Sequence, residues 1–136
     1  MNGPGWWKPP ERVDVKVVGP NNEYPGMVGV RCEVNPGPPD ARWIEFFQNP
    51  QVMSGTSPSS IHFEGPRAGR HYIMFRCADE HLETSVENID SRIKGANSKY
   101  EQEVVPEIET ENQRQADARE SERQRVADLQ ERADRL

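Results

Sequence analysis

The amino-acid sequence predicts an α+β fold, a two-layer sandwich in which a four-stranded antiparallel sheet packs against two helices, followed by a charged C-terminal helix. Three observations predict this fold. Apolar and polar residues alternate in four short segments, which is typical of strands with one buried face. Apolar residues recur at helical spacing in two other segments. Residues 107–136 contain no Gly or Pro and are rich in strong helix formers.

The order of these segments is strand, strand, helix, strand, strand, helix (ββαββα), and then the additional helix. The same order would arise from a ferredoxin-like plait whose last strand had been moved to the front. We divide the chain into an extended leader rich in Gly, Pro and Trp at 1–11, an α+β domain at 12–105 and a charged helical extension at 106–136.

The first two strands are predicted on either side of a turn. In residues 13–17, valines alternate with Asp14 and Lys16, which indicates a half-buried strand. Residues 19–26, GPNNEYPG, are mostly turn formers. Two strands around such a turn most simply form an antiparallel hairpin. Residues 28–34, VGVRCEV, alternate most cleanly, and their buried face is expected to consist of Val28, Val30, Cys32 and Val34.

The first helix is predicted after residues 35–40, NPGPPD, where prolines occupy the early positions and Asp40 offers an N-cap. Trp43, Phe46 and Phe47 then form one apolar stripe at spacings of three and four residues. Such a stripe is either part of the core or the lining of a ligand pocket. We favour the core, which is the commoner role of a stripe with this spacing.

A second hairpin is predicted at residues 60–65 and 71–78, on either side of the turn PRAG and after a loop at 51–60. Asp79 follows directly and offers an N-cap for the next helix. Alternation places five apolar residues of the hairpin on one core face, namely Ile61, Phe63, Ile73, Phe75 and Cys77.

The second helix is predicted from a long apolar stripe. Gly95 weakens this helix by about 1 kcal/mol relative to Ala. Pro106 is expected to end or kink it, because proline has no N–H and clashes with the preceding turn. The members of the stripe are Leu82, Val86, Ile89, Ile93, Ala96 or Asn97, Tyr100 and Val104.

Charge is distributed unevenly along the chain, whose formal net charge is −6. Residues 1–78 carry 8 Lys or Arg against 7 Asp or Glu, whereas residues 79–136 carry 9 against 16. No apolar run approaches the roughly 18 residues of a membrane span, and the N-terminus lacks the apolar region of a secretory signal. Two cysteines are too few for a disulfide framework, so we expect a cytoplasmic protein that does not bind membranes.

Residues that could form metal or catalytic sites do not fall into recognisable patterns. The nearest metal pattern is the pair Cys77 and His81, whereas zinc sites use four ligands in close pairs. Cys32 and Cys77 instead fit the buried faces of their strands, where a free cysteine acts as a small apolar residue. The sequence has no nucleophile-elbow serine motif and no Gly-rich phosphate loop. We therefore expect neither an enzyme nor a cofactor or metal site.

The predicted second hairpin is basic in residues 65–76, where Arg67, Arg70 and Arg76 are candidate phosphate contacts. They define an alternative function, that of a nucleic-acid-associated accessory factor. A chain of net charge −6 would need a second basic patch for this function, and the sequence shows none. Nucleic acid is therefore not the partner that we favour.

The C-terminal helix also carries a charge pattern that stabilises helices by about 0.2–0.5 kcal/mol per pair of opposite charges. A heptad frame through Ile108 is apolar only in its last four positions, which is too few for a self-sufficient coiled coil. These four positions form the candidate partner-binding stripe, made of Val126, Leu129, Ala133 and Leu136. The predicted charge pairs are Glu111/Arg114, Glu120/Arg123, Glu122/Arg125, Asp128/Arg132 and Glu131/Arg135.

Trp6 and Trp7 are further candidate partner-binding residues. Either these rings fold back onto the body, since adjacent exposed tryptophans favour aggregation, or they serve as a short linear ligand for a partner. Together with the stripe, they indicate a non-catalytic protein–protein interaction or assembly protein. Its partner would be another protein or a second copy of the chain.

Residues 76–103, RCADEHLETSVENIDSRIKGANSKYEQE, run from a strand through an acidic cap into a helix that continues through ANSKYEQE. In this layout the chain resembles short uncharacterised proteins of high-GC actinobacteria and their phages, over about residues 60–104. The resemblance implies a phage-borne accessory or host-interaction role. It implies no functional residue, because it leads to no named family.

Overall fold

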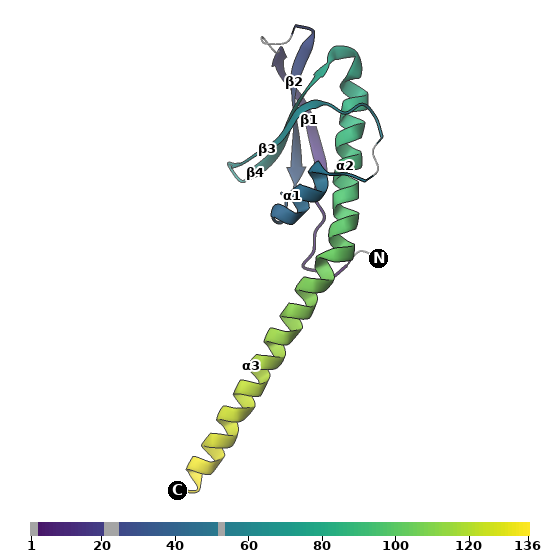
Figure 1. The fold of residues 1–136 in the computed structure, drawn as a ribbon. Coiled ribbons are helices and arrows are strands. Elements are labelled where there is room, and N and C mark those ends of the chain that lie inside the picture. Colours follow the sequence, from purple (N-terminus) through teal and green to yellow (C-terminus); the bar gives the residue numbers. More distant parts are fainter. Residues whose placement is uncertain (1–2, 21–24, 52–53) are drawn as a thin grey trace. The chain divides into compact units, whose positions relative to one another are not determined.

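The computed structural model describes residues 3–20, 25–51 and 54–136 (Figure 1). It contains a four-stranded antiparallel sheet, helices packed on the sheet and a long C-terminal helix, which confirms the predicted fold class. Residues Met1–Tyr100 form one compact unit and Glu101–Leu136 form a second. Residues 1–2 of the predicted leader, 21–24 of the predicted turn and 52–53 of the predicted loop lie outside the described residues.

The sheet consists of two hairpins joined side by side. Its strands lie in the order β1-β2-β4-β3, and all neighbours are antiparallel. The second strand of each hairpin is therefore central and the first strand is at an edge, as expected for a plait whose last strand has been moved to the front. The strands are β1 (Glu11–Pro20), β2 (Met27–Asn35), β3 (Ser59–Arg67) and β4 (Arg70–Ala78).

The alternation predicted for the central strands is confirmed by burial. On β2, Val30 and Cys32 are fully buried, whereas Arg31 between them is only partly covered. On β4, Ile73 and Phe75 are buried, and Phe75 lies directly opposite Val30. These residues form the helix-covered face of the sheet, and the opposite face carries the polar and charged side chains.

Helix α1 (Ala41–Gln48) begins at Asp40, whose carboxylate accepts a hydrogen bond from the Trp43 backbone N–H at 3.2 Å, so the predicted N-cap is confirmed. Trp43 and Phe47 are fully buried and stack with ring centroids 5.8 Å apart. Phe63 of β3 meets both rings edge-on, which closes the core between α1 and the sheet. Phe46 is half-buried. The aromatic stripe is therefore core at Trp43 and Phe47.

Helix α2 (Leu82–Glu103) lies on the same face of the sheet as α1 (Figure 1). It follows a short 3₁₀ turn, Asp79–His81, whose N-cap is Ala78 without a side-chain hydrogen bond. The expectation that Asp79 caps the helix is therefore wrong. Asp79 lies inside the first turn, where its charge still interacts favourably with the helix N-terminus.

The buried stripe of α2 is partly the predicted one. Five of its predicted members are buried, namely Ile89, Ile93, Ala96 and Tyr100 in the helix and Val104 just after it. Three polar residues that the apolar pattern omits are buried as well, namely Ser85, Asn88 and Arg92. Helix α3 (Val105–Asp134) begins after Val104, with Pro106 in its first turn, where a missing N–H costs nothing.

The turn between β3 and β4 is shorter than the predicted PRAG segment, because the strands extend to Arg67 and Arg70. Its two central residues, Ala68 and Gly69, have φ angles of 53° and 77°. Positive φ at both positions is the pattern of a type I′ turn, which prefers Asn-Gly.

Replacing Ala68 with Asn should therefore raise the free energy of unfolding by about 0.5–1 kcal/mol, because Asn tolerates the left-handed conformation better than Ala. Urea denaturation followed by circular dichroism measures this change. Ala68→Val is the matched control and should destabilise the protein, since a β-branched residue adopts positive φ poorly. Equal stability of both variants would contradict the turn assignment.

Candidate functional site

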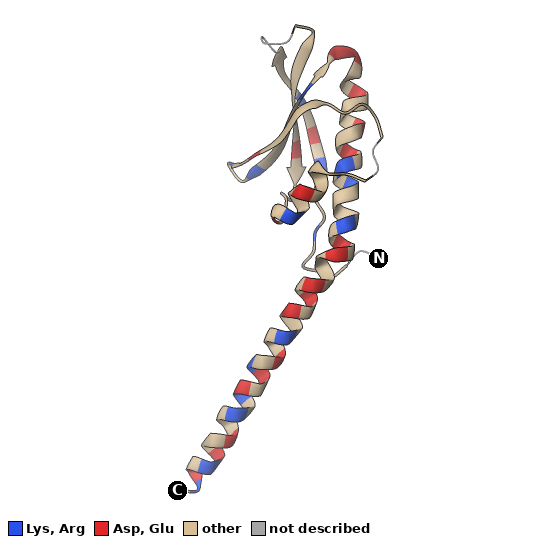
Figure 2. Cartoon of the chain, in the orientation of Figure 1, with Lys and Arg blue, Asp and Glu red and all other residues tan. Residues whose placement is uncertain are grey.

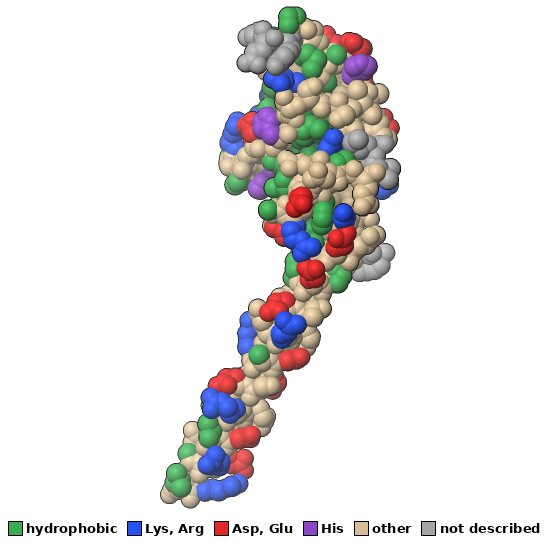
Figure 3. Space-filling model, in the orientation of Figure 1, with side chains coloured by type: hydrophobic (Ala, Val, Ile, Leu, Met, Phe, Trp, Pro, Cys, Tyr) green, Lys and Arg blue, Asp and Glu red, His purple; other side chains and the backbone are tan. Residues whose placement is uncertain are grey.

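The partner-binding stripe predicted on the C-terminal helix is exposed in the structure. The side chains of Val126 and Leu129 are 53% and 44% exposed, and Ala133 and Leu136 are exposed as well. Hydrophobic side chains are visible together on this part of the surface in Figure 3. The spacing of three, four and three residues places all four on one side of a helix.

Arg, Asp and Glu recur along the length of α3, as the colours of the ribbon show (Figure 2). Four of the five predicted charge pairs are formed: Glu111–Arg114 at 2.8 Å, Glu122–Arg125 at 2.6 Å, Glu131–Arg135 at 2.9 Å, and Glu120–Arg123.

The fifth predicted pair on α3 joins Asp128 to Arg132. In the described helix, the Asp128 carboxylate instead accepts a hydrogen bond from the Gln124 side chain at 2.9 Å. These charged side chains thus interact with neighbours on the same helix. The four residues of the apolar stripe take no part in these ion pairs.

The two adjacent tryptophans of the leader have different environments. Trp7 is 6% exposed and stacks on Tyr100 with ring centroids 4.9 Å apart, so it folds back onto the body. Trp6 is 46% exposed. Of the two candidates, Trp6 is therefore the one that offers ring surface to a partner, whereas Trp7 anchors the leader.

The arginines of the basic hairpin lie close to acceptors on the protein itself. Arg67 pairs with Glu64 at 2.5 Å and Arg70 pairs with Glu33 at 3.6 Å, while Arg76 donates to the Ser60 hydroxyl. A phosphate would have to compete with two carboxylates at this site. The pairing therefore does not favour the alternative of nucleic-acid binding.

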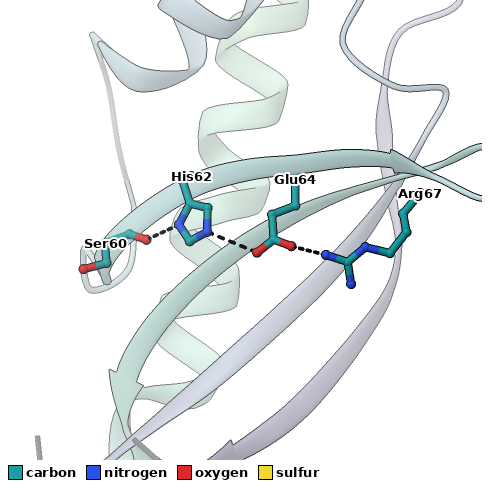
Figure 4. A network of polar contacts seen from close by, with 4 residues as sticks. All are labelled: Ser60, His62, Glu64 and Arg67. Atoms are coloured by element: carbon teal, nitrogen blue, oxygen red, sulfur yellow. Dashed lines mark hydrogen bonds and ion pairs between the residues drawn. The ribbon is translucent and has the colours of Figure 1, made fainter. Parts of the chain in front are cut away.

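Glu64 also belongs to a chain of polar contacts that Figure 4 shows from close by. One ring nitrogen of His62 lies 3.0 Å from the Ser60 carbonyl oxygen, and the other lies 3.3 Å from the Glu64 carboxylate. The contact of His62 with Ser60 is thus to the backbone and not to the hydroxyl. His62 is exposed, and the arrangement does not activate a nucleophile.

Both thiols are buried and free. Burial raises the pKa of Cys32 to about 12 and also raises the pKa of Cys77, so both stay protonated and unreactive at neutral pH. Cys77 and His81 line a small cavity of about 150 Å³ together with Ser85. Residues 3–20, 25–51 and 54–136 contain no group of three or more His, Cys, Asp or Glu side chains that could hold a metal ion.

Two polar contacts that the sequence pattern does not predict connect distant parts of the body. The Arg12 guanidinium of β1 makes two hydrogen bonds to Asp90 of α2, at 2.6 and 3.0 Å. Arg92 of α2 donates to Asn88 at 2.8 Å and to the Phe47 carbonyl oxygen at 3.3 Å. The i, i+4 spacing of Asn88 and Arg92 is the one sequence signal that could have indicated the second network.

Comparisons of the chain with family models, with curated proteins and with solved structures find no match. Within the described part of the chain, no helix is both long and apolar enough to cross a membrane. The structure therefore defines the class, an α+β body with a charged helical extension.

Proposed function

We propose that this chain is a non-catalytic protein–protein interaction or assembly protein, in which the stripe of α3 binds the partner and the α+β body supplies a second surface. The observation that carries the proposal is the exposure of Val126 and Leu129 on a helix whose other side chains are mostly polar or charged and form the four ion pairs described above. Fully burying such a side chain in an interface contributes about 1.5–3 kcal/mol.

The chemistry of the body supports the non-catalytic part of this proposal. The two thiols are buried in their protonated form, and His62 contacts a backbone carbonyl rather than a hydroxyl. We also propose a cytoplasmic location, which the low number of cysteines favours, because disulfide frameworks belong to oxidising compartments.

The proposed function predicts that Val126→Glu/Leu129→Glu lowers partner binding at least about tenfold, since Glu keeps the helix propensity but cannot be buried in an apolar interface. The tagged full chain would be expressed in its own host and cross-linked, and the recovered proteins would be quantified by mass spectrometry. A recovered protein supports the proposal only if the stripe variant loses it.

The matched control is Ala116→Glu/Ala127→Glu, which adds the same charge on other sides of the same helix, because one residue corresponds to about 100° of rotation. This control should bind like the unaltered chain. Equal recovery of every partner by both variants would contradict the proposal. A complex lost steeply between about 50 and 200 mM salt would indicate the nucleic-acid alternative instead.

A further inference from the structure

Strand β1 is an edge strand with an exposed outer edge. Val13 and Val17 are 53% and 49% exposed on it. The backbone N–H of Val15 donates to the side chain of Asp14 at 2.9 Å in an exposed position, so it points away from β2. An edge of this kind, with backbone groups free of the ladder, is a template for pairing with another strand.

Two charged residues of β1 lie directly opposite like charges within the sheet. The register places Asp14 opposite Glu33 of β2, and Lys16 opposite Arg31. Like charges directly opposite each other destabilise an antiparallel pair. The β1–β2 pairing therefore gives neither Asp14 nor Lys16 an opposite charge directly across the ladder.

The two charges of β2 have their partners on β4, the strand on the other side. The Glu33 carboxylate lies 3.6 Å from the Arg70 guanidinium, and the Arg31 guanidinium lies 4.6 Å from the centre of the Tyr72 ring. The charges of β1 thus lie on an edge strand and have no opposite charge directly across on β2, so a strand added at this edge could supply one.

Residues 13–17, VDVKV, are complementary to themselves when two copies run antiparallel. With Val15 opposite Val15 of the second copy, Asp14 of each chain lies opposite Lys16 of the other, within the regular part of the strand. We propose that β1 pairs in this register with β1 of a second copy of the chain. The two sheets then join into one continuous sheet across a twofold axis.

The backbone supports the same register. Because the Val15 N–H points outward, the two copies of Val15 can exchange N–H to carbonyl hydrogen bonds at the twofold axis. The Asp14 carboxylate is then released to the Lys16 ammonium of the other chain. β-Bulges between Arg12 and Asp14 and between Val17 and Gly19 limit the regular segment to four residues, so the pairing is short.

Sedimentation equilibrium of the full chain over about 10 to 500 μM is the test, a range that covers weak dimers. The unaltered chain should shift from the monomer mass to twice that mass, while Asp14→Lys and Lys16→Asp should each stay monomeric. Each substitution replaces a pair of like charges between β1 and β2 with a pair of opposite charges. Both variants should therefore melt at or above the temperature of the unaltered chain. Unfolding therefore cannot account for a lost dimer.

Two further samples keep the proposal separate from the function proposed for α3. Mixing Asp14→Lys with Lys16→Asp should restore the doubled mass, because each variant then meets the charge opposite to its own. Val126→Glu/Leu129→Glu should dimerise like the unaltered chain. The pairing is overturned by a monomer at every concentration, by dimers of both single variants, or by a dimer that only the α3 variant loses; this last outcome would leave the proposed function standing.

Discussion

Replacing Trp43 with alanine should lower the free energy of unfolding by about 4 kcal/mol, because large buried aromatic residues cost 3–5 kcal/mol when truncated to Ala. Trp43 is fully buried, stacks on Phe47 and meets Phe63 edge-on. The substitution leaves a void between α1 and the sheet that the surrounding side chains can fill only in part. Urea denaturation followed by circular dichroism measures the loss.

The Trp43 indole N–H also donates to the Asn97 side chain of α2 at 2.9 Å, and Asn97 in turn donates to the Pro10 carbonyl oxygen at 2.9 Å. Removing the indole therefore weakens the contact between α2 and the leader as well. The two partial controls are Trp43→Phe, which keeps most of the ring packing, and Phe46→Ala, which truncates a half-buried neighbour. Losses as large as that of Trp43→Ala in both controls would contradict a core centred on Trp43.

The strands and helices of the body could be predicted from the sequence because each follows from a local pattern. The alternation in β2 and the stripe of α1 depend only on which residues are apolar and how they are spaced. The Asp40 cap is local too, since it joins residues three positions apart. The exposure of Val126 and Leu129 on α3 follows from the same kind of argument.

The buried polar contacts could not be predicted in the same way, because they depend on residues far apart in the chain. Hydropathy assigns Asn88 and Arg92 to the surface, yet the Phe47 carbonyl oxygen and the Ser57 hydroxyl accept hydrogen bonds from Arg92 and allow its burial. The like charges that face each other across β1 and β2 depend on register, which the two bulges in β1 shift. A partner for the edge of β1 or for α3 is harder still to predict from the sequence, because it depends on a second molecule as well as on the fold.

Raising the pH above about 9 should destabilise the protein steeply, because two buried groups hold their protons more tightly when folded. Burial raises the pKa of Cys32 from 9.0 to about 12. Burial and the hydrogen bond to Asp40 raise the pKa of Tyr100 from 10.0 to about 12. For a group whose folded pKa is raised, the stabilisation is fully present below the unfolded pKa and is lost as the pH rises towards the folded pKa.

From about pH 9 both cysteine thiols contribute, because burial raises both pKa values, and Cys32 alone should lower the free energy of unfolding by about 1.4 kcal/mol per pH unit. Between pH 10 and 12, Tyr100 contributes as well; Cys32 and Tyr100 together should give a slope of about 2.7 kcal/mol per pH unit, to which Cys77 adds. Urea denaturation at a series of pH values measures both slopes.

The matched control for the alkaline loss is the double variant Cys32→Ala/Tyr100→Phe, which removes both protons. It should be less stable at pH 7, because it loses a buried thiol and the hydrogen bond from the Tyr100 hydroxyl to Asp40, 2.7 Å long. Its stability should nevertheless depend less on pH between 9 and 12, where Cys77 still contributes to the remaining slope. A slope equal to that of the unaltered chain would mean that other groups cause the alkaline loss, because a proton that has been removed cannot be linked to folding.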